Sequence, residues 1–230
     1  MSWRSFRWCP VASARRRKRI EDFRGIDIYP VTCENLSSGR SNMEVLDGLI
    51  RGGARIVQLR DKDASKGDLY QVAMRFREIT SKAGILLIIN DHVDIALAVD
   101  ADGVHLGQDD LPVEAARRIG PDLLVGISTH TLGEALAAQS SGADYINIGP
   151  IFYTGTKGGI SDFLGPEAIT AIGSGLEIPF TVMGGIKQTN IHEVLARGAR
   201  RIAVVTALTQ ATDIAAAVRA MRGAISNWNG

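Results

Sequence analysis

The chain has 230 residues, of which 45% are hydrophobic and 22% are charged, a composition typical of an ordinary globular protein. Its formal net charge is +1, but residues 1–24 carry eight Arg and Lys against two acids, a balance of +6 that leaves −5 for residues 25–230 (18 basic, 23 acidic). A mildly acidic body argues against a general nucleic-acid-binding surface, and no apolar run approaches the roughly 20 residues that a membrane helix needs.

The N-terminal segment, residues 1–24, contains no acidic residue before Glu21. We expect it to be a basic, flexible extension outside a catalytic domain that spans residues 25–230. Its Arg-rich composition also fits an organellar transit peptide, and the run from Arg15 to Arg19 fits a basic arm for a nucleic acid or a membrane surface. Of these three interpretations we favour the extension, then the transit peptide, then the arm.

Cys9 and Cys33 are the only cysteines, and they show no metal-ligand spacing. Two thiols in a chain of this length are typical of a reducing compartment, so we expect a cytoplasmic protein. We expect small-molecule partners rather than a nucleic acid or a membrane, and the sequence allows an oligomer.

From Ile26 onward, short apolar runs alternate with longer amphipathic segments. Most of the runs lack strict polar alternation, as expected for strands that are covered on both faces. We predict strands at Ile26–Val31, Ile56–Leu59, Ile85–Ile89, Gly103–Leu106, Leu123–Ile127, Tyr145–Ile148, Phe180–Met183 and Ile202–Val205. We predict helices at Met43–Gly52, Lys66–Lys82, Val93–Val99, Pro112–Ile119, Leu132–Ser141, Pro166–Ile172, Thr189–Arg197 and Asp213–Met221.

One joint recurs where a helix leads into the next strand, at Gly52-Gly53-Ala54-Arg55, Gly142-Ala143-Asp144 and Gly198-Ala199-Arg200. Glycine there suits a left-handed helix C-cap. Eight alternating units in about 200 residues favour a single α/β domain, a closed (βα)8 TIM barrel, over an open doubly wound sheet. No Gly-x-Gly-x-x-Gly follows the first strand, which weakens the case for a dinucleotide-binding fold.

Polar residues follow almost every predicted strand, at the end of the barrel where active sites of this fold lie. Scattered surface polarity would not follow apolar runs so regularly. In strand order these residues are Gln58, Arg60 and Lys62; Asn90 and Asp91; Gln108, Asp109 and Asp110; Ser128 and His130; Thr154, Thr156 and Lys157; Gly184 and Gly185; and Thr206.

The charges among these residues indicate a phosphorylated ligand and a metal ion. Arg60, Lys62 and Lys157 are three cations, which suit a polyanion such as a diphosphate. Asp91 and Asp110 would repel a diphosphate unless a hard cation lay between them. Mg²⁺ is the natural choice, because it accepts one or two carboxylates together with phosphate oxygens and water.

The loop after the seventh strand predicts a second anion pocket, because Gly184-Gly185 exposes backbone N–H groups where such barrels often bind phosphate. Each residue also has a purely structural interpretation, and only their joint placement favours function. Those interpretations are a tight turn for Gly184-Gly185, a helix N-cap for Asp110, turn chemistry for Asn90-Asp91 and helix capping for His130. Three histidines without ligand spacing are expected to be structural: His92, His105 and His192.

The residues at the strand ends resemble the motifs of thiamine phosphate synthases, also called thiamine-phosphate pyrophosphorylases. The likeness runs from about Ile26 to Ile225, with the motifs in order and at similar spacing. The chain differs at Tyr153, where the family usually has proline, and at Thr206, where serine is frequent. The matching segments are Gln58-Leu-Arg-Asp-Lys62, Asn90-Asp91, Gly103-Val-His-Leu-Gly-Gln-Asp-Asp110, Gly126-Ile-Ser-Thr-His130, Gly149-Pro-Ile-Phe-Tyr-Thr-Gly-Thr-Lys157, Gly184-Gly-Ile186 and Val204-Val-Thr-Ala207.

The resemblance implies a Mg²⁺-dependent transferase of thiamine biosynthesis. The family joins 4-amino-2-methyl-5-pyrimidinylmethyl diphosphate to a thiazole phosphate or its carboxylate, giving thiamine phosphate and diphosphate by a dissociative mechanism. It implies Mg²⁺ at Asp91 and Asp110, and catalytic roles for Arg60, Lys62, Ser128 and Lys157. The pyrimidine diphosphate would bind Gln58, Arg60, Lys62, Asn90, Ser128 and Lys157. The thiazole phosphate would bind Thr154, Thr156, Gly185, Val205 and Thr206.

Three other functions compete with this one. A thiazole tautomerase of the same superfamily would be expected to lack several of the five charged residues present here, Arg60, Lys62, Asp91, Asp110 and Lys157. A non-catalytic sensor of the phosphate ligand would need a partner motif, and the basic tail is the only candidate. A sugar-phosphate isomerase or lyase would need a lysine or a carboxylate pair inside the barrel, whereas we expect Val, Ile and Leu there.

Overall fold

The computed structural model describes residues 12–154 and 163–228, and within them eight parallel strands form one sheet in the order β1-β8-β7-β6-β5-β4-β3-β2. The sheet closes on itself where Val31, after β1, bridges Gln58 of β2. The predicted TIM barrel is confirmed. The strands are β1 (Ile28–Pro30), β2 (Ile56–Leu59), β3 (Leu86–Asn90), β4 (Gly103–Leu106), β5 (Leu124–Thr129), β6 (Tyr145–Ile148), β7 (Phe180–Val182) and β8 (Ile202–Val204).

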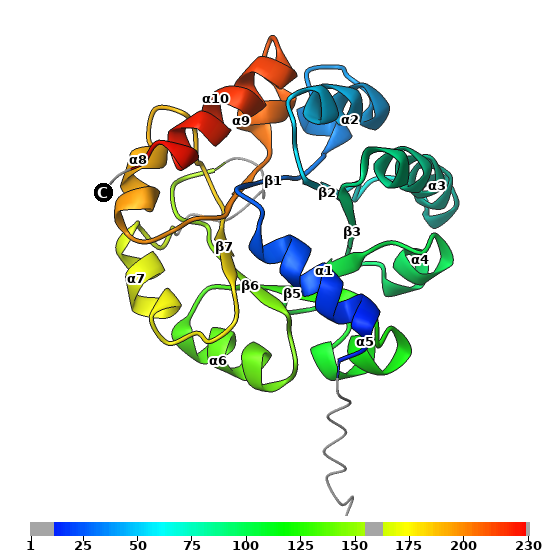
Figure 1. The fold of residues 1–230 in the computed structure, drawn as a ribbon, viewed down its shortest axis with the longest axis horizontal. Helices are drawn as coiled ribbons and strands as arrows, with labels where there is room; N and C mark the ends of the chain where they lie inside the picture. The colour runs from blue at the N-terminus through cyan, green and yellow to red at the C-terminus, as the bar shows by residue number, and fades with distance from the viewer. Residues whose placement is uncertain (1–11, 155–162, 229–230) are drawn as a thin grey trace, which may run out of the picture.

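Helices surround this ring of strands (Figure 1). Each predicted strand and helix overlaps an observed one, and the additional elements are α1, α9 and the 3₁₀ turn Glu34–Leu36. The helices are α1 (Ala14–Arg24), α2 (Asn42–Arg51), α3 (Lys66–Ala83), α4 (Val93–Ala98), α5 (Val113–Ile119), α6 (Leu132–Ser140), α7 (Glu167–Gly173), α8 (Ile191–Ala196), α9 (Thr206–Thr209) and α10 (Ile214–Ser226).

The strands separate two packed layers, and β3 shows how. Leu87 and Ile89 pack outward against the helices, whereas Leu86 and Ile88 pack inside the barrel. Successive side chains of a strand point to opposite faces, so a strand buried on both faces must be apolar throughout. This is why the strands read as unbroken apolar runs in the sequence.

The repeated glycine joint has the predicted conformation. Gly142 and Gly198 follow α6 and α8 with φ of 95° and 93°, a region that residues with a side chain rarely adopt. A Cβ atom at either position would meet nothing within 4 Å, so the backbone conformation and not a lack of space requires glycine there.

Helix α1 crosses the floor of the barrel, the end at which the strands begin (Figure 1). Its Phe23 is 1% exposed and stacks on Tyr145 of β6, with ring centroids 4.2 Å apart. Arg19 is 5% exposed and forms an ion pair with Asp102, the residue before β4. The expected flexible extension of residues 1–24 is therefore too long: its last turns fold as a helix because Phe23 has apolar surface to cover and Arg19 has a partner.

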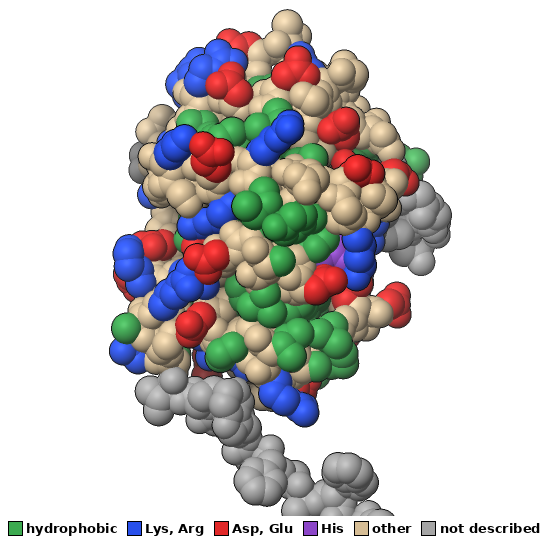
Figure 2. All heavy atoms as spheres, turned by 90° about the vertical axis from the view of Figure 1, so that its right-hand side faces the viewer, with side chains coloured by type: hydrophobic (Ala, Val, Ile, Leu, Met, Phe, Trp, Pro, Cys, Tyr) green, Lys and Arg blue, Asp and Glu red, His purple; other side chains and the backbone are tan. Residues whose placement is uncertain are grey.

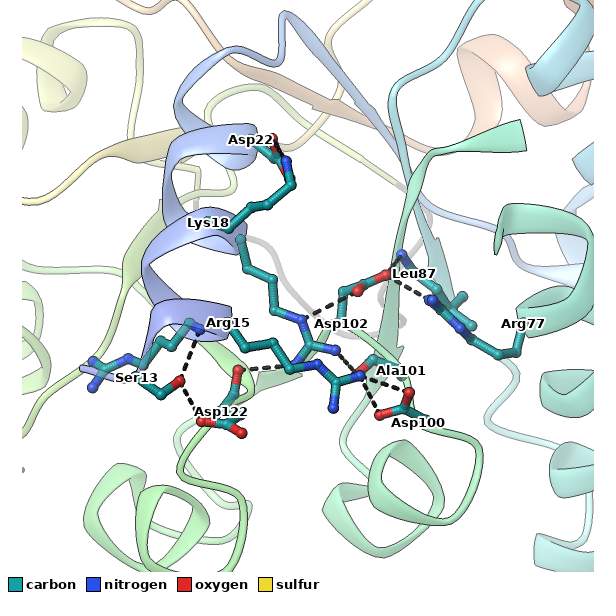
Figure 3. Close-up of polar contacts among 12 residues, drawn as sticks. Ser13, Arg15, Lys18, Asp22, Arg77, Leu87, Asp100, Ala101, Asp102 and Asp122 are labelled. Atoms are coloured by element: carbon teal, nitrogen blue, oxygen red, sulfur yellow. Dashed lines mark hydrogen bonds and ion pairs between the residues drawn. The ribbon is translucent and has the colours of Figure 1, made fainter. Parts of the chain in front are cut away.

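Figure 3 shows Arg15 of α1 bonded to Asp100, in the loop that precedes β4. The Arg19 guanidinium also donates to the carbonyls of Ala101 and Asp122, over 3.0 and 2.9 Å. Desolvation by burial lowers the pKa of Arg19, and the neighbouring Asp102 opposes that shift. Part of the positive charge in the basic run from Arg15 to Arg19, which fitted a nucleic-acid-binding arm, is thus paired inside the molecule.

The outer wall over α3, α4 and α5 is a mixture of charged and apolar side chains (Figure 2). Met74, Leu97 and Ile119 are 44%, 43% and 53% exposed on this wall. Among the helices that the structure describes, none is both long enough and apolar enough to cross a membrane.

Candidate active site

A cavity opens at the mouth of the barrel, where the strands end. Eleven of the thirteen predicted site residues line it, although they come from segments far apart in the chain. The other two, Thr156 and Lys157, lie outside the described residues. The eleven are Gln58, Arg60, Lys62, Asn90, Asp91, Asp110, Ser128, Thr154, Gly185, Val205 and Thr206.

Two carboxylates and a lysine form the charged side of the cavity. Lys62 Nζ lies 3.2 Å from Asp91 Oδ2. Desolvation by burial and the nearby Asp110 carboxylate raise the pKa of Asp91, and Lys62 only partly offsets them. Asp110 Oδ2 in turn accepts a 2.6 Å hydrogen bond from the backbone N–H of Gly107. The Asp91 and Asp110 carboxylates are therefore held close together and repel each other when both are ionised.

This donor set fits Mg²⁺. In the described residues there is no group of three or more His, Cys, Asp or Glu side chains that could enclose a metal ion. Mg²⁺ does not need one, because it commonly binds through one or two carboxylates and completes its shell with phosphate oxygens and water. A divalent cation at Asp91 and Asp110 would also remove the repulsion that raises the pKa of Asp91.

Arg60 is anchored beside this charged side by the end of β1. Its backbone N–H donates to Thr32 Oγ1 over 3.2 Å, and its Nη1 lies 3.2 Å from the sulfur of the buried Cys33. Arg60, which follows β2, is thus held at the cavity wall by two residues that follow β1, across the barrel closure. Cys33, which the sequence left without a role, packs against a site residue.

The opposite side of the cavity is formed by backbone. Gly184 and Gly185 have φ of 107° and 62°, and a Cβ on Gly184 would lie 2.6 Å from Pro150. Asn190 Nδ2 donates to the Gly185 carbonyl over 3.1 Å and fixes the turn. Val205 follows β8 and Thr206 begins α9, and both line the same cavity. The glycines are needed both for their conformation and for close packing.

The polar side chains inside the barrel were not predicted from the sequence. His105 and Asn147 line the cavity while being 5% and 4% exposed, and Tyr29 and Tyr145 lie beneath them inside the barrel. The expectation that strand interiors are only Val, Ile and Leu is therefore wrong. The available signal was a single polar residue interrupting an apolar strand, as in Gly103-Val-His-Leu and Tyr145-Ile-Asn-Ile.

Two other residues singled out near the strand ends, His130 and Gln108, have structural contacts. His130 does not cap α6, whose N-cap is Thr131, but it lies at the start of that helix: its N–H donates to Glu134 Oε2 over 2.7 Å, and its side chain also borders the cavity. Gln108 Nε2 donates to the Ser128 carbonyl over 2.6 Å, and neither Gln108 nor Asp109 is among the lining residues.

Comparison with known proteins identifies relatives over nearly the whole barrel. Residues 28–208 match the family described as thiamine monophosphate synthase. The chain is 45% identical to the thiamine-phosphate synthase of Pelotomaculum thermopropionicum over 212 residues, covering 92% of this chain and 97% of the relative. It is 47% identical to that of Chloroflexus aurantiacus over 199 residues, covering 86% and 92%.

Solved structures give the same picture. A thiamine phosphate pyrophosphorylase from Pyrococcus furiosus superimposes with a TM-score of 0.82 at 35% identity, covering 89% of this chain and 98% of that one. A 3-hexulose-6-phosphate synthase superimposes with a TM-score of 0.66 at 17% identity over 86% of this chain and 99% of that one, a likeness of fold alone.

Proposed function

The chain belongs to the thiamine monophosphate synthase family, and from this premise we propose how the mouth of its barrel carries out the reaction. It is a transferase of thiamine biosynthesis that condenses a pyrimidine and a thiazole moiety, and its substrates are small molecules. The observation that supports our assignment of roles is that residues at the ends of seven strands, predicted one by one, line a single cavity.

The charged side of the cavity would hold the pyrimidine diphosphate. Arg60 and Lys62 bring positive charge to the leaving group, and Lys157 is assigned beside them from the sequence. The remaining contacts of this substrate are assigned to the uncharged polar residues Gln58, Asn90 and Ser128. The glycine side would hold the thiazole phosphate, through the backbone N–H groups at Gly185 and the segment Val205-Thr206, with Thr154 and Thr156.

Asp91 and Asp110 would hold Mg²⁺. When bound, the ion supplies positive charge to the diphosphate and orients it as a leaving group. The two carboxylates suit it because one of them, Asp91, is destabilised in its ionised form without a cation.

The reaction proposed is a dissociative alkyl transfer. The C–O bond between the pyrimidine methylene and the diphosphate breaks first, and the diphosphate leaves with the electron pair. The electron-rich aminopyrimidine stabilises the methylene cation, and the thiazole nitrogen lone pair then forms the new C–N bond. Arg60, Lys62 and Lys157 stabilise the charge that develops on the leaving group, and the second pocket holds the nucleophile in line. No protein nucleophile is required.

A turnover assay tests the function. Purified protein is incubated with the pyrimidine diphosphate, the thiazole phosphate and Mg²⁺, and thiamine phosphate is followed by its fluorescent oxidation product, with EDTA as the control. We expect product that EDTA abolishes. Folded protein that isomerises a thiazole phosphate but gives no thiamine phosphate would instead be a tautomerase. We further propose that the reaction takes place in the cytoplasm.

Lys157→Ala gives a second test of the proposed binding mode. We expect a loss of turnover on the order of 100-fold and weaker binding of the pyrimidine diphosphate, because a cation that stabilises developing charge is removed. The Michaelis constant for the thiazole phosphate serves as the internal control. Wild-type kinetics in this variant would contradict the assignment.

A further inference from the structure

A chain of hydrogen bonds runs beneath the cavity through the interior of the barrel. Gln58 Nε2 donates to the Tyr29 hydroxyl over 2.9 Å, and Tyr29 and Tyr145 share a 2.9 Å hydrogen bond. The Tyr145 hydroxyl lies 3.0 Å from His105 Nδ1, and His105 Nε2 lies 2.9 Å from Ser128 Oγ. Both ends, Gln58 and Ser128, line the cavity, whereas the two tyrosines are fully enclosed. None of the three middle residues has a role in the function described above.

The first bond favours one direction for the chain, although the geometry of the other contacts allows either donor. Tyr29 accepts from Gln58, which leaves its own proton for Tyr145, and in this direction Tyr145 donates to His105 Nδ1. Burial raises the pKa of Tyr29 and of Tyr145, so both hydroxyls keep these protons. With Nδ1 as an acceptor, the neutral imidazole carries its proton on Nε2 and donates it to Ser128 Oγ.

The direction sets what each end offers to a ligand. Ser128 accepts a hydrogen bond from His105, so its hydroxyl proton is available as a donor toward the cavity. Gln58 donates one of its two amide N–H groups to Tyr29, which orients the amide and leaves its oxygen as the acceptor for the cavity. An acceptor at one end and a donor at the other match an aminopyrimidine, which has an exocyclic amino donor and ring-nitrogen acceptors.

We propose that Tyr29, Tyr145 and His105 are positioning residues that fix the hydrogen-bonding polarity of Gln58 and Ser128 for the aminopyrimidine substrate. This rests on the proposed function, because it concerns how that site recognises one of its substrates. A fixed polarity matters because the Ser128 hydroxyl and the Gln58 amide can each rotate. Without the chain, neither group would be held in one orientation before the substrate binds.

The first test removes one hydroxyl. Tyr145→Phe keeps the ring that packs on Phe23 and fits against Gly126, but it removes the hydroxyl that lies 3.0 Å from His105 Nδ1. We expect kcat/KM for the pyrimidine diphosphate to fall about tenfold, the loss of one well-placed hydrogen bond, while the KM for the thiazole phosphate changes less than about twofold. Thr80→Val, which removes a fully buried hydroxyl from α3 far from the site, is the matched control and should leave both constants unchanged.

A double-mutant cycle separates positioning from general disturbance. In a Ser128→Ala background the chain has lost the group it acts on, so adding Tyr145→Phe should lower kcat/KM by less than about twofold more. Tyr29→Phe should behave in the same way with Gln58→Ala. A further tenfold loss in either double variant would overturn the proposal, because it would mean that the tyrosines act through something other than the two cavity residues.

The protonated ring nitrogen of His105 is a readout independent of activity. In ¹⁵N-labelled wild-type protein we expect His105, identified by its absence from the His105→Gln spectrum, to carry its proton on Nε2, and we expect this preference to weaken in Tyr145→Phe. A proton on Nδ1 in the wild type would reverse the chain and overturn the proposal. An inactive wild type with the Nε2 proton in place would contradict the proposed function but not the polarity of the chain.

Discussion

Asp91 occupies a backbone conformation that non-glycine residues rarely adopt, with φ of 62°. Its backbone N–H donates to the His105 carbonyl over 2.8 Å, and its carboxylate faces Lys62 while burial and Asp110 raise its pKa. Backbone strain and electrostatic strain thus meet at one residue. Such residues persist where function requires them, which supports the role of Asp91 as a metal ligand.

Replacing this carboxylate should stabilise the metal-free protein. Because the pKa of Asp91 is raised in the folded protein, the fold is most stable when this carboxyl is protonated. That stability is fully present below the ordinary pKa of 3.8 and is lost as the pH rises through the raised pKa. Asp91→Asn should therefore increase the free energy of unfolding at pH 7 by about 1 kcal/mol, and the difference should vanish below pH 3.8. Thermal unfolding at the two pH values measures this. Mg²⁺ should raise the melting temperature of the wild type only, and equal Mg²⁺ stabilisation of both proteins would count against the assigned site.

Asp110→Ala should depress turnover on the order of 100-fold, because one of the two carboxylates that would hold Mg²⁺ is lost. The Mg²⁺ concentration needed for half-maximal rate should rise, with partial rescue by excess Mg²⁺. A titration of rate against Mg²⁺ concentration checks both effects. An unchanged half-maximal concentration would remove Asp110 from the metal site.

Helix α1 lies in a segment that the sequence predicts to be a flexible basic extension, whereas the structure shows a packed helix. Its basic residues are oriented in two ways: Arg19 is buried against Asp102, whereas Arg15 pairs with Asp100 at the surface. Arg16 binds Asp144, the residue before β6, over 2.8 Å. The helix therefore ties together loops that precede different strands, and its Phe23 supports the ring of Tyr145.

Two of the ion pairs of α1 give a matched comparison. The Arg19 and Asp102 side chains are 6% and 12% exposed, whereas those of Arg15 and Asp100 are 49% and 66% exposed. Arg19→Ala should lower the free energy of unfolding by about 3 kcal/mol, because it leaves Asp102 with less compensation for burial. Arg15→Ala should lower it by less than about 1 kcal/mol. Urea unfolding measures both, and equal effects would contradict the view that burial decides the contribution.

Across the whole molecule, the two ends of the barrel carry different sets of residues. The floor holds α1 and its ion pairs, the outer wall holds the helices, and the mouth holds the residues assigned to substrate and metal (Figure 1). Tyr145 contacts both Phe23 of the floor and His105 below the mouth, but the residues assigned to substrate and metal are otherwise distinct from those that pack the floor and the wall. Stability and activity should therefore be separable by mutations outside this link.

A pair of variants tests this separation. Leu49→Ala, at a fully buried position of α2, should lower the free energy of unfolding by about 3 kcal/mol and leave kcat/KM at 25 °C within about twofold of the wild type. Lys62→Ala, whose side chain is 53% exposed, should lower kcat/KM on the order of 100-fold and change stability by less than about 1 kcal/mol. Denaturant unfolding and steady-state kinetics on both proteins decide the matter. A loss of both properties in either variant would mean that mouth and wall are coupled.

The barrel and most of the residues at its mouth can be predicted from the amino-acid sequence. Periodicity identifies strands covered on both faces, the Gly142 and Gly198 joints mark the repeated unit, and polar residues directly after strands mark the ends that must meet in a parallel barrel. These are local signals, and each is carried by a few neighbouring residues.

The contacts of α1 and of the polar interior became visible only in the folded chain. Arg19 lies 83 positions from its partner Asp102, and Tyr29 lies 116 positions from Tyr145. A basic residue or a tyrosine has the same local pattern whether it faces water or a distant partner. The burial that gives Phe23, Arg19 and His105 their functions arises when the ring of strands closes, and no local signal in the sequence specifies which side chains then face one another.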